Sequence, residues 1–340
     1  MKGSPLVSAL VLLVLLVAAA AIYDFVNGFQ DSANVVATMI ASRALSPRGA
    51  LLLAAAGTLA GPFVIGVAVA RTVGSEVLSP DAITVAVAMA ALLAATCWNL
   101  SAWYFSVPVS SSHALIGGLL GAGLHEGGAA AVQTAGIVKV AASLLISPVL
   151  GFLVALGIMH LTLWALRKAT PHANVVLLRL QVVTSVMLAI GNGGNDAQKT
   201  VGVVSLGLLL LGFTQTFTVP WWAIALSASM LALGTVVGGE RVARTLGTRF
   251  YKVRPIHGFT SQASAAAVIV GASLMGGPVS STQVVGLAIV GAGAAERRSK
   301  VRWALLGDIA WAWALTVPAS ALIAMPLHAG ISFLLRRGGA

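Results

Sequence analysis

The sequence predicts an all-α integral membrane protein with roughly 10 to 12 membrane segments, including re-entrant half-helices, arranged as two inverted repeats. Composition is the first observation behind this class: 58% of the 340 residues are hydrophobic, 9% are charged, and the mean hydropathy is +0.97. A soluble domain carries about 25% charged residues, so no room is left for a sizeable soluble part. The other two observations are a series of apolar runs and two polar motifs that each occur twice.

The apolar runs predict the membrane helices in order. They lie at roughly 5–26, 49–71, 82–104, 129–166, 175–192, 201–213, 220–239, 256–275 and 303–335. A crossing needs roughly 20 apolar residues, so the run at 129–166 predicts two helices, broken near Ser147 and Pro148. The first run imitates a secretory signal, but it continues directly into polar residues, and we expect it to remain as a helix.

Three shorter apolar pieces, at 35–41, 114–124 and 284–295, each follow a polar stretch. They are too short to cross the hydrocarbon layer and fit re-entrant half-helices, which occur only where protein or a cavity covers the backbone. The membrane domain is therefore expected to be hollow at these places.

The polar stretches form an internal repeat. Two pairs of segments match: GFQDSAN (28–34) with GGNDAQK (193–199), and VPVSSSHALIGG (107–118) with GGPVSSTQVVGL (276–287). We therefore expect two transmembrane repeats, 1–166 and 173–340, divided at the loop between them. Transporters built in this way place their substrate site at the repeat interface near the midplane, where interrupted helices correspond.

Two of the nine acidic residues, Asp31 and Asp196, occupy equivalent places in the first motif, at the expected breaks of two helices. An ionisable group inside the membrane costs roughly 2.5 to 3.5 kcal/mol on the mildest scale, so both are candidate functional residues. Asp24 and Asp308 fit either a functional role or structural pairing with an Arg or Lys. The remaining acids lie in or beside loops, where solvated charges are expected: Glu76, Asp81, Glu126, Glu240 and Glu296.

The second motif places proline and then three hydroxyls directly before an apolar half-helix. These hydroxyls belong to Ser110, Ser111 and Ser112 in the first repeat and to Ser280, Ser281 and Thr282 in the second. One of the three would serve as an N-cap, and the free N–H groups and partial positive charge of a helix N-terminus bind anions. Two such ends facing each other predict a site for a tetrahedral oxyanion.

Carboxylates near that anion require a counter-cation. Two of them about 4 to 6 Å from a dianion would repel it by several kcal/mol. A carboxylate that takes up H⁺, or binds Na⁺ with amide oxygens such as those of Asn34 and Asn195, would couple anion entry to cation entry. Lys199 stands where the first repeat has Asn34, so one half would carry a tethered cation.

These paired motifs resemble the inorganic phosphate transporter (Pit) family, whose signature is G-x-N-D-x-A-N in each repeat, with P-V-S-T/S-T/S-H later in each half. The resemblance covers nearly the whole chain and is strongest to the bacterial low-affinity branch. It implies a multi-pass protein of the cytoplasmic membrane that carries phosphate, largely as a neutral metal–phosphate complex, by proton symport and alternating access. No catalytic residue and no resident cofactor or metal are implied.

The resemblance also implies roles for individual residues. Cation coupling and part of the phosphate site would fall to Asp31, Asn34, Asn195 and Asp196. Phosphate oxygens would bind the six hydroxyls Ser110, Ser111, Ser112, Ser280, Ser281 and Thr282, and we add Lys199 to the substrate-binding set.

The sequence departs from the family pattern in three places. Gln30 replaces the first Asn, and Gln198 with Lys199 replaces Ala-Asn in the second repeat, as in the bacterial branch. An ammonium at a sodium-ligand position favours H⁺ over Na⁺ as the coupling ion. Gln283 replaces a His that the first repeat keeps as His113, which fits either a proton carrier or a structural histidine.

Three competing functions follow from other readings of the same features. A permease of this fold could take sulfate, although carboxylate acceptors favour hydrogen phosphate, which can donate a proton. An intramembrane hydrolase would use Ser111 or Ser112 with His113, but adjacent residues on a helix point in different directions. Nucleic-acid binding would use the net charge of +11, but the basic residues lie in short breaks typical of cytoplasmic loops. The sequence leaves open whether the protein forms a homo-oligomer.

Overall fold

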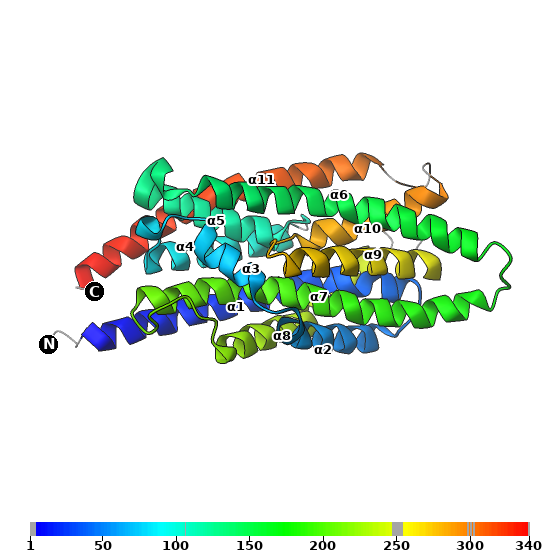
Figure 1. Ribbon diagram of the computed structural model, residues 1–340, viewed down its shortest axis with the longest axis horizontal. Coiled ribbons are helices and arrows are strands. Elements are labelled where there is room, and N and C mark those ends of the chain that lie inside the picture. The colour runs from blue at the N-terminus through cyan, green and yellow to red at the C-terminus, as the bar shows by residue number, and fades with distance from the viewer. Residues whose placement is uncertain are drawn as a thin grey trace.

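The computed structural model describes residues 5–105, 107–246, 254–297, 299, 301 and 303–338, and these residues are predominantly helical. The longer helices lie side by side along one axis, and both termini lie at the same end (Figure 1). The helices of at least 16 residues are α1 (Pro5–Ala41), α2 (Pro47–Ile65), α4 (Val85–Tyr104), α5 (Ser111–Gly127), α6 (Thr134–Ala165), α7 (Ala173–Leu210), α8 (Trp221–Leu246), α9 (Pro255–Leu274), α10 (Ser281–Glu296) and α11 (Trp303–Gly338). One-turn elements, α3 (Ala68–Arg71) and a π-helical turn η1 (Thr72–Glu76), follow α2.

The all-helical membrane class is confirmed. Within the described ranges, seven helices are long and apolar enough to cross a membrane: α1, α2, α4, α6, α7, α8 and α11. Many large apolar side chains on them face outward, such as Leu145 on α6 and Leu322 on α11, as expected where a helix contacts lipid. The larger number of 10 to 12 segments, which includes short helices, stays a prediction.

The expected breaks at the carboxylate motifs are wrong. α1 runs without interruption through GFQDSAN, so 35–41 is not a separate half-helix, and α7 joins the two runs at 175–192 and 201–213 into one helix of 38 residues. A helix satisfies its own backbone groups, and here the polar side chains find partners on neighbouring helices, so nothing forces the backbone to open. Asp31 and Asp196 therefore lie inside continuous helices.

The expected break at Ser147 and Pro148 is also wrong. α6 is one helix of 32 residues with Pro148 inside it. Membrane helices tolerate proline because neighbouring groups or local adjustments accommodate the freed carbonyl. At 1.5 Å per residue α6 is about 48 Å long, so it tilts or extends beyond a hydrocarbon layer of about 30 Å.

The two short helices after the hydroxyl runs are confirmed. α5 has 17 residues and α10 has 16, fewer than the roughly 20 that a crossing needs. Ser110 caps α5 by accepting a hydrogen bond from the backbone N–H of His113 (3.2 Å). Ser280 caps α10 in the same way, from the backbone N–H of Gln283 (3.4 Å).

Helices from the two halves of the chain pack against each other in matching pairs. α1 packs on α8 and α7 on α2, while α5 packs on α11 and α10 on α6. Equivalent glycines allow the close approach: a Cβ at Gly28 would clash with the Leu231 carbonyl on α8, and one at Gly193 would clash with the Thr58 carbonyl on α2. These contacts bring the two carboxylate helices, α1 and α7, alongside each other.

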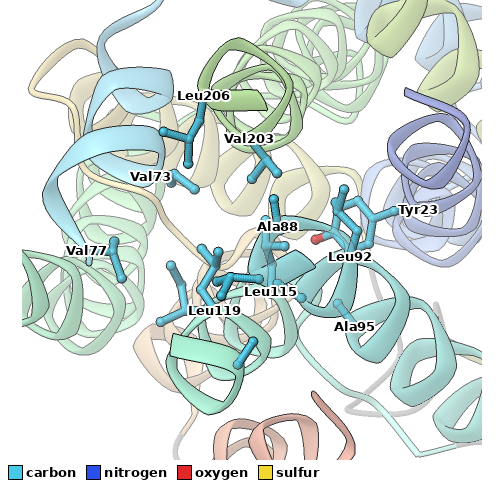
Figure 2. Packing of buried hydrophobic residues seen from close by; sticks show 14 of the residues in the cluster. Tyr23, Val73, Val77, Ala88, Leu92, Ala95, Leu115, Leu119, Val203 and Leu206 are labelled. Carbon is cyan, nitrogen blue, oxygen red and sulfur yellow. The ribbon is translucent and has the colours of Figure 1, made fainter. Parts of the chain in front are cut away.

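A buried apolar cluster supports this arrangement from one side. It joins side chains of α1, η1, α4, α5 and α7, among them Tyr23, Leu92, Leu115 and Val203 (Figure 2). α5 packs mainly on α4 and α11. Its N-terminus meets both carboxylate helices, because Tyr23 on α1 donates to the Ser111 carbonyl and Lys199 on α7 donates to Ser112.

Candidate functional site

The two polar motifs meet across the halves of the chain. The carboxylate motif on α1 lies against the N-terminus of α10, and the carboxylate motif on α7 lies against the N-terminus of α5. Because α1 also packs along α7, the two crossed contacts share one polar interior. We call them the Asp31 half-site and the Asp196 half-site.

The Asp31 half-site is built from a carboxylate, an amide and two hydroxyls. Ser281 donates to Asp31 Oδ2 (2.6 Å) and Thr282 donates to Asp31 Oδ1 (3.1 Å). Asn34, one turn further along α1, donates through Nδ2 to Asp31 Oδ1 (3.1 Å) and to Thr282 Oγ1 (3.0 Å). In the described part of the chain no Lys or Arg forms an ion pair with the Asp31 carboxylate, although this carboxylate is buried.

The Asp196 half-site contains a buried ion pair. Lys199 Nζ donates to Asp196 Oδ1 (2.5 Å), to Ser112 Oγ (2.5 Å) and to the Val279 carbonyl (3.1 Å). These three bonds use all three hydrogens of the ammonium group. Ser112 in turn donates to the Val279 carbonyl (2.7 Å). The side chains of Lys199 and Asp196 are each 2% exposed, so the pair is shielded from solvent.

The other predicted hydroxyls divide between caps and the site. Ser110 and Ser280 are the helix caps, and Ser110 Oγ also lies 2.8 Å from Nδ1 of His113. Ser111 accepts a hydrogen bond at its backbone carbonyl from the Tyr23 hydroxyl (3.0 Å). The ring of His113 therefore contacts Ser110, rather than either serine named for a hydrolase.

Asn195 lies one residue before Asp196, but its side chain hydrogen-bonds to the end of α9 and to the loop that follows it. Its Nδ2 donates to Ser273 Oγ (2.7 Å) and to the Gly277 carbonyl (3.3 Å), and its Oδ1 accepts from the backbone N–H of Val279 (3.3 Å). These bonds tie α7 to the end of α9 and to the segment between α9 and α10. Asn195 thus positions the Val279 carbonyl, which accepts from Lys199, and its amide is engaged within the second half.

Two residues of α1 outside the predicted site, Asp24 and Tyr23, also reach the polar interior. Asp24 is buried and accepts a hydrogen bond from the Thr200 hydroxyl (2.6 Å), next to Lys199; within the described residues it has no Arg or Lys partner. Its spacing of seven residues from Asp31 places both on one helix face, a signal that was available. Tyr23 carried no distinguishing pattern. The side chain of Asp308, the fourth candidate carboxylate, lies outside the described residues.

The arrangement can hold an anion and a cation together. The backbone N–H groups at the buried N-termini of α5 and α10 and the hydroxyls of these ends are hydrogen-bond donors of the kind that bind an oxyanion. The Asp31 half-site offers carboxylate, hydroxyl and amide oxygens, which are the ligands of hard cations and the acceptors of protons.

Known proteins are similar to this chain in sequence and in fold. A profile described as the Phosphate transporter family matches residues 27–178 and again residues 165–324. A protein of Rhizobium meliloti (strain 1021), named a probable low-affinity inorganic phosphate transporter, is 41% identical over 92% of this chain and 94% of its own length. A protein of the same name from Bacillus subtilis (strain 168) is 34% identical over 92% and 95%.

One solved structure is also similar. It is described as the sodium-dependent phosphate transporter, and it matches with a TM-score of 0.87 over 96% of this chain and 100% of that chain, at 24% identity. This likeness shows that the two chains share a fold.

Proposed function

The chain belongs to the phosphate transporter family, and we propose that it carries inorganic phosphate across the cytoplasmic membrane by symport with a cation and alternating access. The names of its relatives support phosphate as the substrate, and the seven apolar helices support a multi-pass membrane protein. The single observation that carries the proposal is the crossed pairing of carboxylate and hydroxyl motifs in a buried interior.

We propose that 1–166 and 173–340 are inverted repeats. The helix pairing supports this, since exchanging the halves turns the contact of α1 with α8 into that of α7 with α2, and the contact of α5 with α11 into that of α10 with α6. The double match of the family profile agrees with it. A transporter of this kind would alternate access by moving one repeat against the other around the shared site.

The proposed phosphate site lies between the N-termini of α5 and α10. Its donors are the hydroxyls that remain after capping, Ser111, Ser112, Ser281 and Thr282, with Ser110 and Ser280 fixing the helix ends. Lys199 neutralises Asp196, which removes one of the two carboxylate charges that would repel a dianion in a medium of low dielectric constant. Asp31, Asn34, Asn195 and Asp196 are the proposed cation-coupling residues: Asp31 and Asn34 at the site of the mobile cation, and Asn195 and Asp196 at the equivalent place, which Lys199 occupies. Asp31 is also the proposed acceptor for the proton of hydrogen phosphate.

We propose H⁺ as the coupling ion rather than Na⁺. The ammonium of Lys199 fills the place in the second half that a sodium ion would need. The structural relative is described as sodium-dependent, so Na⁺ is the runner-up. A divalent metal would travel as cargo with phosphate, because a neutral metal–phosphate complex avoids the repulsion from the buried carboxylates.

The test is uptake of radiolabelled phosphate into proteoliposomes that contain the purified protein. An imposed pH gradient or an imposed Na⁺ gradient supplies the driving force, and a parallel sample contains excess unlabelled sulfate. Uptake driven by the pH gradient and indifferent to sulfate is expected. Uptake that only a Na⁺ gradient drives would overturn H⁺ as the coupling ion. Uptake abolished by sulfate would mean that the site accepts tetrahedral oxyanions other than phosphate. Absence of phosphate uptake under either gradient would overturn the proposal.

A further inference from the structure

The two half-sites place one nitrogen each at the same position. Asn34 follows Asp31 by three residues, and Lys199 follows Asp196 by three. Asn34 Nδ2 bridges Asp31 and Thr282 at 3.1 and 3.0 Å. Lys199 Nζ bridges Asp196 and Ser112, both at 2.5 Å. In each case the nitrogen connects the carboxylate of its own half to the third hydroxyl of the other half.

The two nitrogens differ in charge. We propose that the Lys199 ammonium is a built-in cation that permanently occupies the second of two equivalent cation sites, so that the transporter couples phosphate to one mobile cation, bound at Asp31. This inference rests on the proposed cation symport and specifies its stoichiometry.

The surroundings of Lys199 leave no place for a second cation. Its three hydrogens point to a carboxylate, a hydroxyl and a carbonyl oxygen, the oxygen types that otherwise ligate a hard cation. The carboxylate is already neutralised by the ion pair, and the pair is buried. A further positive charge there would face the ammonium within a few ångströms, which is strongly unfavourable at low dielectric constant.

The Asp31 half-site has the same oxygen types without a resident charge. Asp31 meets Ser281 and Thr282, and the amide of Asn34 can present its own oxygen by rotating about its last bond. A buried carboxylate without a cation is costly next to a phosphate anion. A mobile cation, H⁺ or Na⁺, removes that cost for the occupied state, and this links phosphate entry to cation entry.

The stoichiometry can be measured at zero net flux. Proteoliposomes with the membrane potential clamped at zero receive a tenfold gradient of the coupling cation, and the balancing gradient of the transported phosphate species is determined. One mobile cation balances a phosphate gradient of about tenfold, and two cations balance about a hundredfold. The wild-type protein is expected to balance a phosphate gradient of about tenfold. A balancing gradient of about a hundredfold would overturn the inference but would leave cation-coupled transport intact. Absence of any uptake in the wild type would instead overturn the proposed function.

The variant Lys199→Asn restores in the second half the amide of the first half. It is expected to move the balance point to about a hundredfold, because the vacated site now accepts a second cation. Lys139→Asn is the matched control, since Lys139 forms a half-exposed ion pair with Glu76 outside the site; its balance point stays at the wild-type value. A Lys199→Asn protein that transports with an unchanged balance point would overturn the inference. Should the variant fail to fold, the wild-type measurement alone decides.

Discussion

The Asp31 and Asp196 half-sites have the same geometry but hold their carboxylates in opposite ways. Asp31 accepts hydrogen bonds from two hydroxyls and an amide, whereas Asp196 forms an ion pair with Lys199. The two half-sites therefore differ by one exchange of an amide, Asn34, for an ammonium, Lys199. Within the described part of the chain, Asp31 has no resident cation, whereas Asp196 is paired with one. The comparison shows that a repeated site can stay symmetric in shape while its two halves take different tasks. Our predictions test that division.

The largest difference in stability is expected from the same substitution in the two half-sites. Asp196→Asn leaves a buried ammonium without its partner, which should lower the free energy of unfolding by about 3–5 kcal/mol. Asp31→Asn removes a hydrogen-bond acceptor but also a buried charge that has no ion-pair partner among the described residues, so it should cost no more than about 1–2 kcal/mol. Denaturant unfolding of both variants in the same detergent measures the difference. Equal losses would mean that the two half-sites do not differ in charge pairing.

Removing both members of the ion pair should recover much of that loss. Replacing a buried pair by apolar or neutral groups is often close to neutral, so Asp196→Asn with Lys199→Met is expected to show a coupling energy of about 2 kcal/mol or more. The corresponding cycle in the other half-site, Asp31→Asn with Asn34→Leu, should give about 0.5–1 kcal/mol. A second cycle as strongly coupled as the first would contradict the assignment of a single resident cation.

The packing of the two carboxylate helices should be equally sensitive. Gly28→Ala and Gly193→Ala each direct a methyl group into a backbone carbonyl of the facing helix, and each should destabilise the protein by about 1–3 kcal/mol. Gly286→Ala on α10 is the control, because a Cβ there meets no atom within 4 Å, and it should be neutral or slightly stabilising. Thermal unfolding in detergent compares the three. A clear difference between the first two would argue against equivalent repeats.

The smallest effect is expected at Tyr23. Its hydroxyl donates to the Ser111 carbonyl near the N-terminus of α5, so Tyr23→Phe should cost about 0.5–1.5 kcal/mol of stability. Tyr104→Phe removes a hydroxyl from an exposed ring and serves as the reference. If both variants unfold alike, the Tyr23 hydrogen bond does not hold α5 in place.

The class of the fold and the residues that meet in the candidate site could be predicted from the sequence, because both depend on local patterns. Apolar runs located the helices, and the duplicated motifs selected Asp31, Lys199 and Thr282 from a chain with few polar residues. The helix breaks were predicted wrongly at α1, α6 and α7. A polar stretch or a proline in a membrane helix has either a broken backbone or a partner on another helix, and only the tertiary contacts decide between them.

The crossed pairing was the feature that the sequence could not supply. The motif order was compatible with each carboxylate meeting the hydroxyls of its own repeat, and the structure instead joins Asp31 to Ser281 and Lys199 to Ser112. The contacts of Asn195 were hidden for the same reason, since its partners lie at the end of α9 and in the following loop, about 80 residues away. Contacts between distant segments depend on the packing of whole helices.

The most direct test of the account compares two modes of phosphate movement in Asp31→Asn. One sample measures uptake driven by a gradient of the coupling cation, and the other measures exchange of external labelled phosphate for internal phosphate with no gradient. If Asp31 holds the mobile cation, gradient-driven uptake should fall by about tenfold or more, and exchange should fall by a smaller factor, because exchange loses only the hydrogen bond that Asp31 accepts from phosphate. Gradient-driven uptake at the wild-type rate in Asp31→Asn would contradict the assignment of the coupling cation to Asp31.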